Sequence, residues 1–246
     1  MLAKLRMELD AEDLTYKKSS LFQGVLMERI DSAYGEELHQ QKMRPYSQYI
    51  TREKGKNLWY INTLDEESYE KIICPFLNGP DVLTLCHPQE REVHIRSREL
   101  TTKKKATLLQ EFYNEQANNK VEMEFQTPTA FRQKGRYIIL PDLRLLCQNL
   151  MMKYSATSGQ VDMVDEETLE QLTDHSILSR HRIRSLPFPM EGTVIPGFVG
   201  TITIQCKGTE TMARYLRLLL EFGEYSGVGV RTAMGMGAIH IRREED

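Results

Sequence analysis

The sequence of 246 residues lacks any long apolar run. A membrane-spanning helix needs about 20 consecutive apolar residues, and no stretch comes near that length. The N-terminal segment MLAKLRMELD alternates apolar with charged residues, whereas a signal peptide has a continuous apolar centre. These absences predict a cytoplasmic protein that makes no membrane contact.

Cysteine is scarce as well. The chain has four cysteines, far apart in apolar surroundings and without a CxxC pair, and a histidine (His87) lies next to only one of them. The remaining histidines are scattered without the spacing of metal ligands. We therefore interpret the cysteines as buried thiols and expect no disulfide, metal site or cofactor. The four residues are Cys74, Cys86, Cys147 and Cys206.

The chain also lacks the excess of positive charge that is typical of nucleic-acid-binding proteins. Its formal net charge is −3 and its pI is about 6.1. The distribution of charge matters more than the sum, because basic residues cluster in segments 96–105, 131–136 and 180–184. These clusters allow one basic face, although each run alone is also typical of a solvated surface.

The pattern of the first half of the chain predicts strands and helices in alternation. Residues 2–9 alternate apolar with charged side chains, as in a half-buried strand. Ser19 or Ser20 can cap a helix whose apolar residues recur at helical spacing up to Ile30. The segment 37–50 follows this helix, and no regular element is assigned to it. Further strands are expected at 58–62, 82–86 and 92–98 and a helix at 66–77, and we interpret this half of the chain as β-α-β-β-α-β in outline.

The second half repeats this order of elements. We expect a short helix near 105–115, strands at 121–125, 137–140, about 180–188 and 193–206, helices from Asp142 and over 209–222, and a final strand. The recurrence predicts an α+β protein of two tandem ferredoxin-like (RRM-like) domains. Their predicted limits are residues 1–103 and 104–246, and a C-terminal glycine-rich loop belongs to the second.

This loop contains one third of the 15 glycines of the chain. Glycine permits positive φ and lets backbone N–H groups approach a phosphate, and Arg231 adds a cation. A Rossmann motif is excluded because position 232 is Thr where GxGxxG needs a third glycine, and no Walker motif is present. Two interpretations stay open: a phosphate cradle, or a tight connection between a helix and a strand. The five glycines are Gly223, Gly227, Gly229, Gly235 and Gly237.

Four blocks of the sequence resemble a known family, the CRISPR-associated endoribonucleases of the RAMP superfamily that process precursor RNA. The blocks are SSLFQGVLMERI with ELHQQKMRPYS, FQTPTAFRQKGRYIILPD, GTVIPGFVGTITI and FGEYSGVGVRTAMGMGAI. The glycine block is the most specific, and PTAF and IPGFVG look most like the members that accompany type III systems. The fold of the family, two tandem ferredoxin-like domains, agrees with the order of elements above.

The resemblance implies cleavage of precursor CRISPR RNA within its repeats, without a metal, to give guide RNAs for antiviral defence. Its implied partners are the repeat RNA, often a hairpin, and a CRISPR effector complex in transient contact, with the chain acting as a monomer or homodimer. Family members bind RNA at the glycine-rich loop and in the cleft between the domains. The matching residues here are Gly227, Gly229, Arg231, Thr232, Gly235 and Gly237.

Metal-independent cleavage uses the 2′-hydroxyl of the RNA as nucleophile and leaves a 2′,3′-cyclic phosphate and a 5′-hydroxyl, so two protons must move and charge on phosphorus must be stabilised. His39 follows the first helix, where the family's general acid-base histidine usually lies, and imidazole suits proton transfer near neutral pH. Lys42 and Arg44 are expected to stabilise the phosphorane. Some relatives have a tyrosine where this chain has Met27, and Tyr34 is the candidate to replace it.

Six further residues are candidates for contacts to the RNA. Two come two and three residues after Arg44 and are expected to position the ribose or the phosphate, two belong to an expected loop, and two belong to a basic strand. They are Tyr46, Ser47, Arg132, Lys134, Arg180 and Arg182.

Two other functions remain open from the sequence. A non-catalytic RAMP subunit that binds guide RNA in an effector complex would share the fold and the glycine loop, but His39 and its basic neighbours argue against it. A small-molecule-binding or acylphosphatase-like protein would share only the topology and would not bind RNA.

Overall fold

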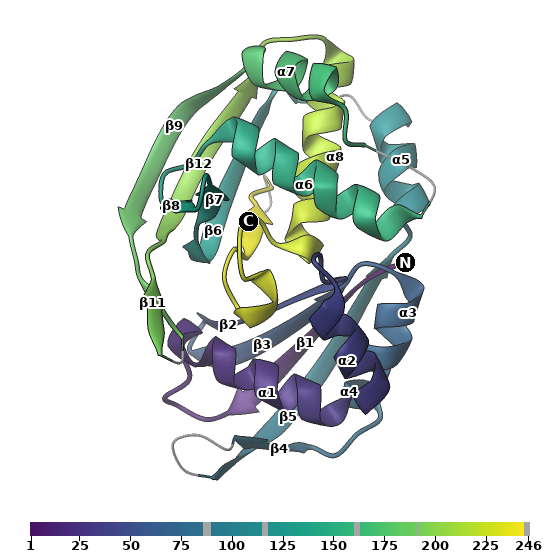
Figure 1. The fold of residues 1–246 in the computed structure, drawn as a ribbon, viewed down its shortest axis with the longest axis vertical. Helices are drawn as coiled ribbons and strands as arrows, with labels where there is room; N and C mark the ends of the chain where they lie inside the picture. The colour runs from purple at the N-terminus through teal and green to yellow at the C-terminus, as the bar shows by residue number, and fades with distance from the viewer. Residues whose placement is uncertain (86–89, 115–117, 160–162, 191, 244–246) are drawn as a thin grey trace.

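The computed structural model describes residues 1–85, 90–114, 118–159, 163–190 and 192–243, and it has two lobes stacked along the long axis of the molecule (Figure 1). Each lobe is a β-sheet with helices packed against one face. Within the described ranges, no helix is long and apolar enough to cross a bilayer.

The N-terminal lobe contains a five-stranded antiparallel sheet in the order β2-β3-β1-β5-β4. The first four of these strands have the order of a ferredoxin-like sheet, and β4 is an additional strand at the edge beside β5. The elements are β1 (Leu2–Asp10), η1 (Tyr16–Lys18), α1 (Ser19–Arg29), α2 (Ser32–Gln40), β2 (Tyr46–Glu53), β3 (Lys56–Thr63), the helical run α3 (Glu66–Ser68), η2 (Tyr69–Ile73) and α4 (Cys74–Leu77), β4 (Val82–Leu85) and β5 (Arg91–Lys103).

The C-terminal lobe contains a four-stranded sheet in the order β13-β6-β12-β9, which is again the ferredoxin-like order. The predicted tandem α+β fold is therefore confirmed. The elements are α5 (Lys105–Asn114), β6 (Lys120–Thr129), β7 (Phe131–Gln133), β8 (Arg136–Ile138), α6 (Leu143–Ser158), α7 (Glu166–Asp174), β9 (Ser176–Ser185), β10 (Phe188–Met190), β11 (Thr193–Ile195), β12 (Phe198–Cys206), α8 (Glu210–Ser226), η3 (Thr232–Met234) and β13 (Ile239–Ile241).

Three local features differ from the sequence prediction. The segment 37–50, to which no regular element was assigned, forms the end of α2 and most of β2. Ser19 does not cap the first helix, because its Oγ accepts a hydrogen bond from the Ile50 amide instead (3.1 Å). The segment 131–136, expected as a loop, is the β7–β8 hairpin, whose turn residues Lys134 and Gly135 both have positive φ, as a two-residue hairpin turn requires.

Two of the four cysteines, Cys147 and Cys206, are buried and Cys74 is half-buried, and all three are free thiols. Cys86 and its neighbour His87 lie outside the described residues. Cys147 and Cys206 thus lie in the apolar core of the C-terminal lobe, as the sequence predicted, whereas Cys74 is only partly buried.

The two lobes are joined through the residues around Trp59. This indole is fully buried between Phe22 and Phe76, as expected for a core residue, and its Nε1 donates to Gln48 Oε1 (2.9 Å). Gln48 Nε2 in turn donates to the carbonyl oxygen of Ala233 (3.1 Å), which belongs to the C-terminal glycine-rich segment. A hydrogen-bond chain thus runs from the centre of the N-terminal lobe into the C-terminal loop.

Apolar contacts join the lobes too. Leu2 and Leu64 pack in the core of the C-terminal lobe, and Ala233 packs in the core of the N-terminal lobe. The rings of Tyr49 and Tyr60 stack on the N-terminal sheet. They pack with Ala238, which directly precedes β13 of the C-terminal lobe. We propose that the two lobes correspond to the two predicted domains, with the boundary at residues 103 and 104 between β5 and α5.

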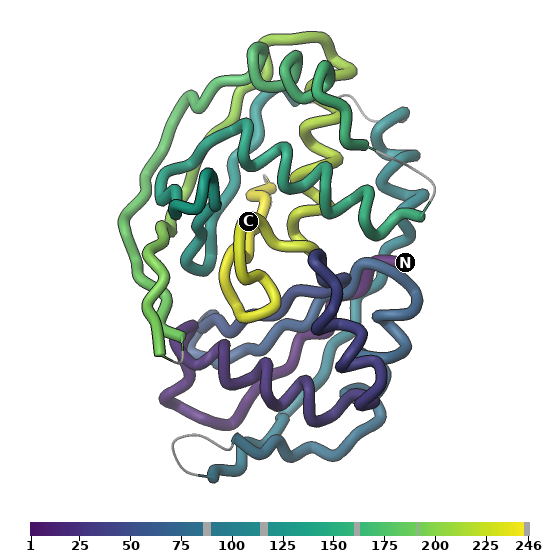
Figure 2. The backbone as a smooth tube through the Cα atoms, in the orientation of Figure 1, coloured from purple at the N-terminus to yellow at the C-terminus, as the bar shows by residue number. Residues whose placement is uncertain are grey.

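Residues 227–238, the glycine loop, lie between the two lobes (Figure 2). Its glycines allow backbone to approach backbone. A Cβ on Gly229 would collide with the Ala130 carbonyl oxygen, and one on Gly237 would collide with the Val228 carbonyl oxygen; both glycines also have positive φ, +76° and +73°. The close packing fixes the loop against its surroundings.

We predict that Gly237→Ala lowers the free energy of unfolding by about 3 kcal/mol or more, because a left-handed conformation and an overpacked Cβ both cost energy. The matched control is Gly135→Ala, since Gly135 has a similar φ of +79° but no atom within 4 Å of the added Cβ, and should lose only about 1 kcal/mol. Urea denaturation of both variants measures the difference. Equal losses in the free energy of unfolding would show that the close contacts around Gly237 do not contribute to stability.

Candidate functional site

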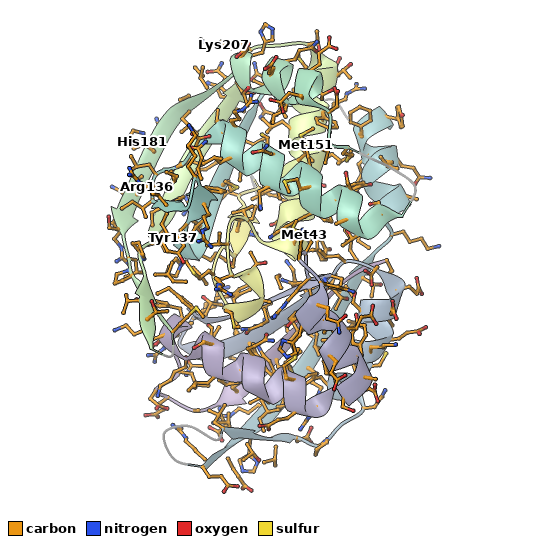
Figure 3. All side chains as sticks on the ribbon, viewed as in Figure 1. Met43, Arg136, Tyr137, Met151, His181 and Lys207 are labelled. Carbon is orange, nitrogen blue, oxygen red and sulfur yellow. The ribbon has the colours of Figure 1, made fainter. Side chains whose placement is uncertain are left out.

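An open cleft of about 410 Å³ lies where the two lobes meet. Its walls are the 41–44 segment after α2, the β7–β8 hairpin, one face of α6 and residues 229–234 of the glycine loop. Met43 and Tyr137 lie on either side of this loop (Figure 3). The cleft thus gathers segments from the first, middle and last parts of the chain.

The charge of the cleft is uniform in sign. Five cationic side chains line it, and no Asp or Glu is among the described residues of its walls. A concave surface with one sign of charge concentrates the electric field and attracts polyanions, even in a protein of net charge −3. The five cations are Lys42, Arg44, Arg132, Lys153 and Arg231.

His39 lies in the last turn of α2, with an exposed side chain. The sequence analysis placed it after the first helix; it belongs instead to a second helix, whose N-cap is Asp31. The cleft wall begins two residues further on, at Gln41. The helix therefore presents the imidazole to solvent near the start of the cationic wall.

Tyr34 is placed less favourably for catalysis. Its side chain is only 3% exposed, and the Lys71 ammonium lies over its ring. Burial, together with nearby carboxylates such as Asp65, raises the pKa of the Tyr34 phenol well above its usual value. Tyr34 and Lys42 do line a neighbouring hollow together, but Asp65 and Glu67 share it. Tyr34 is thus a neutral, buried phenol outside the cationic cleft.

Tyr46 and Ser47, expected to contact RNA, are buried and have protein partners. Tyr46 exchanges hydrogen bonds with Gln23 (2.7 and 3.0 Å), and Arg44 Nη1 approaches its hydroxyl at 3.5 Å. Ser47 Oγ donates to the Tyr225 carbonyl oxygen (2.6 Å). We therefore assign Tyr46 to the support of Arg44 and Ser47 to the contact between the lobes, in place of direct RNA contact.

The glycine amides of the loop have acceptors within the protein. Those of Gly227 and Gly237 donate to the carbonyl oxygens of Gly223 (2.9 Å) and Pro128 (3.1 Å), and that of Gly229 donates to Asn149 Oδ1 (2.8 Å). Gly235 likewise donates to the Thr232 carbonyl oxygen (3.4 Å). These four glycines serve the tight connection, which was one of the two interpretations open from the sequence.

Three other amides of the loop have no acceptor within the described part of the chain. They are those of Arg231, Thr232 and Ala233, and all three residues line the cleft. The phosphate cradle, the other interpretation open from the sequence, stays a prediction, and the loop amides without a described acceptor are those of this short turn.

Lys153 was not among the candidates from the sequence; its side chain is only 7% exposed and lines the cleft. Its Nζ donates to the carbonyl oxygens of Ser226 (3.0 Å) and Gly227 (2.9 Å) and to Thr232 Oγ1 (3.2 Å). Burial lowers the pKa of this ammonium to about 7, whereas the three acceptors favour its charged form. One feature of the sequence could have identified it: this lysine interrupts the apolar stripe of a predicted helix, directly before Tyr154.

The basic segments of the C-terminal lobe occupy two places. Arg132 lines the cleft, and Lys134 is in the turn of the same hairpin. Arg180 and Arg182 are exposed on the edge strand β9 and are not among the residues that line the cleft. None of the four forms an ion pair with a described residue.

The chain matches known proteins over nearly its whole length. Residues 123–239 match the family model described as CRISPR-associated endoribonuclease Cas6. The chain is 33% identical to the CRISPR-associated endoribonuclease Cas6 of Streptococcus thermophilus over 241 residues, which cover 98% of this chain and 96% of that protein. It is 35% identical over 220 residues to the Cas6 of Mycobacterium tuberculosis H37Rv, with 89% of this chain and 70% of that protein covered.

Solved structures share the fold. A Cas6 product complex superposes with a TM-score of 0.80 at 24% identity, and a Cas6 substrate mimic complex with a TM-score of 0.75 at 23% identity. Both comparisons cover 98% of this chain and 99% of the other. With the sequence identity to the curated relatives, they lead to one conclusion: the chain belongs to the Cas6 family of CRISPR-associated endoribonucleases, which process precursor CRISPR RNA.

Proposed function

We propose that the protein cleaves precursor CRISPR RNA within its repeats by attack of the RNA's own 2′-hydroxyl, and that the RNA strand lies in the cleft between the lobes. The observation that carries this proposal is the cleft wall, with five cations and no described carboxylate. Phosphate contacts supply most of the affinity of a protein for a nucleic-acid backbone. The solved relatives named as product and substrate mimic complexes support RNA as the ligand.

The proposed chemistry needs no metal, because the nucleophile belongs to the substrate. His39 transfers a proton to or from the reacting oxygens, since its imidazole is exposed at the entrance of the cationic wall. Lys42 and Arg44, which follow within the cleft wall, stabilise the charge that develops on phosphorus. The products are a 2′,3′-cyclic phosphate and a 5′-hydroxyl.

The C-terminal lobe holds the RNA in this proposal. Arg231 of the glycine loop and Arg132 of the β7–β8 hairpin bind phosphates, and the amides of Thr232 and Ala233 add donors to the same phosphate path. Arg180 and Arg182, outside the cleft, form a separate exposed surface on β9 that contacts flanking RNA. Tyr34 takes no part, because a buried neutral phenol away from the cleft cannot reach the scissile phosphate.

The first prediction concerns His39. In single-turnover cleavage of the organism's repeat RNA in EDTA, His39→Ala should lower the rate by about 100- to 10,000-fold, the usual contribution of a general acid or base. Its affinity for the RNA should change less than threefold, because the cationic walls are intact. The matched control is His94→Ala, which removes an exposed histidine on β5 and should cut at the wild-type rate.

Mapping of the cut ends completes this experiment. A single cut with a 2′,3′-cyclic phosphate on the upstream fragment is expected. A His39→Ala variant that retains the wild-type rate would remove His39 from the mechanism. Wild-type protein that binds the repeat RNA but leaves it intact would favour the non-catalytic guide-RNA-binding function.

The second prediction concerns the cleft cations. Arg132→Ala and Arg231→Ala should each weaken RNA binding about tenfold and reduce the slope of log K against log[salt] by about 0.7, the value for one phosphate contact to a single strand. Lys207→Ala is the control, since Lys207 is exposed at the far end of the C-terminal lobe (Figure 3). If all three variants bind alike across the salt range, the RNA does not follow the cleft.

A further inference from the structure

The base of the glycine loop is the C-terminus of α8. The last carbonyl groups of a helix have no amide partner within the helix and carry a partial negative charge. Here the carbonyl oxygens of Ser226 and Gly227 both accept from Lys153 Nζ, at 3.0 and 2.9 Å. A cation from α6 therefore closes the end of α8 where the chain turns into the loop.

The third hydrogen bond of Lys153 reaches further into the loop, to Thr232 Oγ1 at 3.2 Å. An ammonium has three N–H donors, and each of them has an acceptor here. Because Lys153 Nζ is directed to these three acceptors and the side chain is only 7% exposed, we do not assign Lys153 the role of general base. Its hydrogen bonds join the end of α8 to η3.

The residue before Thr232 is held in an unusual conformation. Arg231 has φ +58° and ψ +33°, the left-handed region that non-glycine residues seldom adopt. Its carbonyl oxygen accepts from the amides of Met234 (2.9 Å) and Met236 (3.3 Å). Such a conformation persists only where the surrounding contacts impose it, and it frequently marks a functional position. The exposed Arg231 side chain lines the cleft.

We propose that Lys153 is a positioning residue for RNA binding: by joining the end of α8 to Thr232, it holds Arg231 in the left-handed conformation that directs the guanidinium to an RNA phosphate. The inference rests on the proposed function, because it assigns Lys153 an effect on RNA that is exerted through Arg231.

A double-mutant cycle tests this proposal. Repeat-RNA affinity is measured for wild type, Lys153→Met, Arg231→Ala and the double variant. Lys153→Met should weaken binding about as much as Arg231→Ala, roughly tenfold, and the double variant should bind no worse than Arg231→Ala alone, since residues that act through one contact are not additive. A lysine that attracted RNA directly by its charge, or that merely stabilised the fold, would give losses that multiply.

Lys105 provides the matched control. It also donates to a carbonyl oxygen and hydroxyls at a helix end, those of Thr157 and Ser158 in α6, but it has no contact with the glycine loop. Lys105→Met should leave RNA affinity within twofold of wild type, and its effect should be additive with that of Arg231→Ala. Thermal unfolding of each variant shows that the proteins compared are folded.

Thr232→Val and Thr232→Ser keep the proposal testable if Lys153→Met does not fold. The valine removes only the hydroxyl that accepts from Lys153, and it should weaken binding severalfold in wild type but not in the Arg231→Ala variant. The serine retains the hydroxyl that accepts from Lys153 and should lose less affinity than the valine does. Equal affinity of the valine and serine variants would contradict the proposal.

Two failures are distinguishable. If wild-type protein binds and cuts repeat RNA but the losses from Lys153→Met and Arg231→Ala multiply, or Lys153→Met has no effect, only the positioning role is overturned. If wild-type protein does not bind the RNA, or Arg231→Ala binds as tightly as wild type, the proposed function of the cleft fails and this inference fails with it.

Discussion

The close approach of backbone to backbone in the glycine loop is the constraint on which the geometry of the cleft depends. The loop contacts both lobes at once: the Val230 amide donates to the Ala130 carbonyl oxygen (2.9 Å), and the Ala233 carbonyl oxygen accepts from Gln48 (3.1 Å). Without Cβ atoms at Gly229 and Gly237, the chain can pass between these partners. The position of Arg231 relative to Arg44 on the other lobe follows from this packing.

The separation of charge explains how an acidic protein carries a cationic cleft. Carboxylates away from the cleft are engaged with cations of their own. Arg243 Nη2 lies 3.2 Å from a carboxylate oxygen of Glu224 on α8, and Arg242 Nη1 lies 2.8 Å from one of Glu122. Pairs of this kind cancel locally, whereas the cleft cations have no described acidic neighbour in its walls. The net charge of −3 is therefore a poor guide to the field that a ligand meets.

The sequence predicted the fold class well, because β1 and α6 have the periodicity of elements with one buried face. It did not reveal β2, whose first five residues are all buried, because the C-terminal lobe covers the face of the sheet opposite to the helices. For the same reason Ser47, a polar residue beside candidate catalytic residues, is buried. Lys153 could not be recognised, since a lysine in a helix is normally solvated and only the end of α8 gives it acceptors.

The location of the loop in the sequence has a consequence for how the molecule is made. All other segments of the cleft wall precede residues 229–234 in the chain, and Ala233 and Ala238 fill gaps in the packing of the N-terminal lobe. A growing polypeptide thus has an incomplete first lobe until residues 233–238 have been made. The cationic cleft is consequently the last feature of the molecule to form, because its final wall segment, residues 229–234, is made close to the end of synthesis.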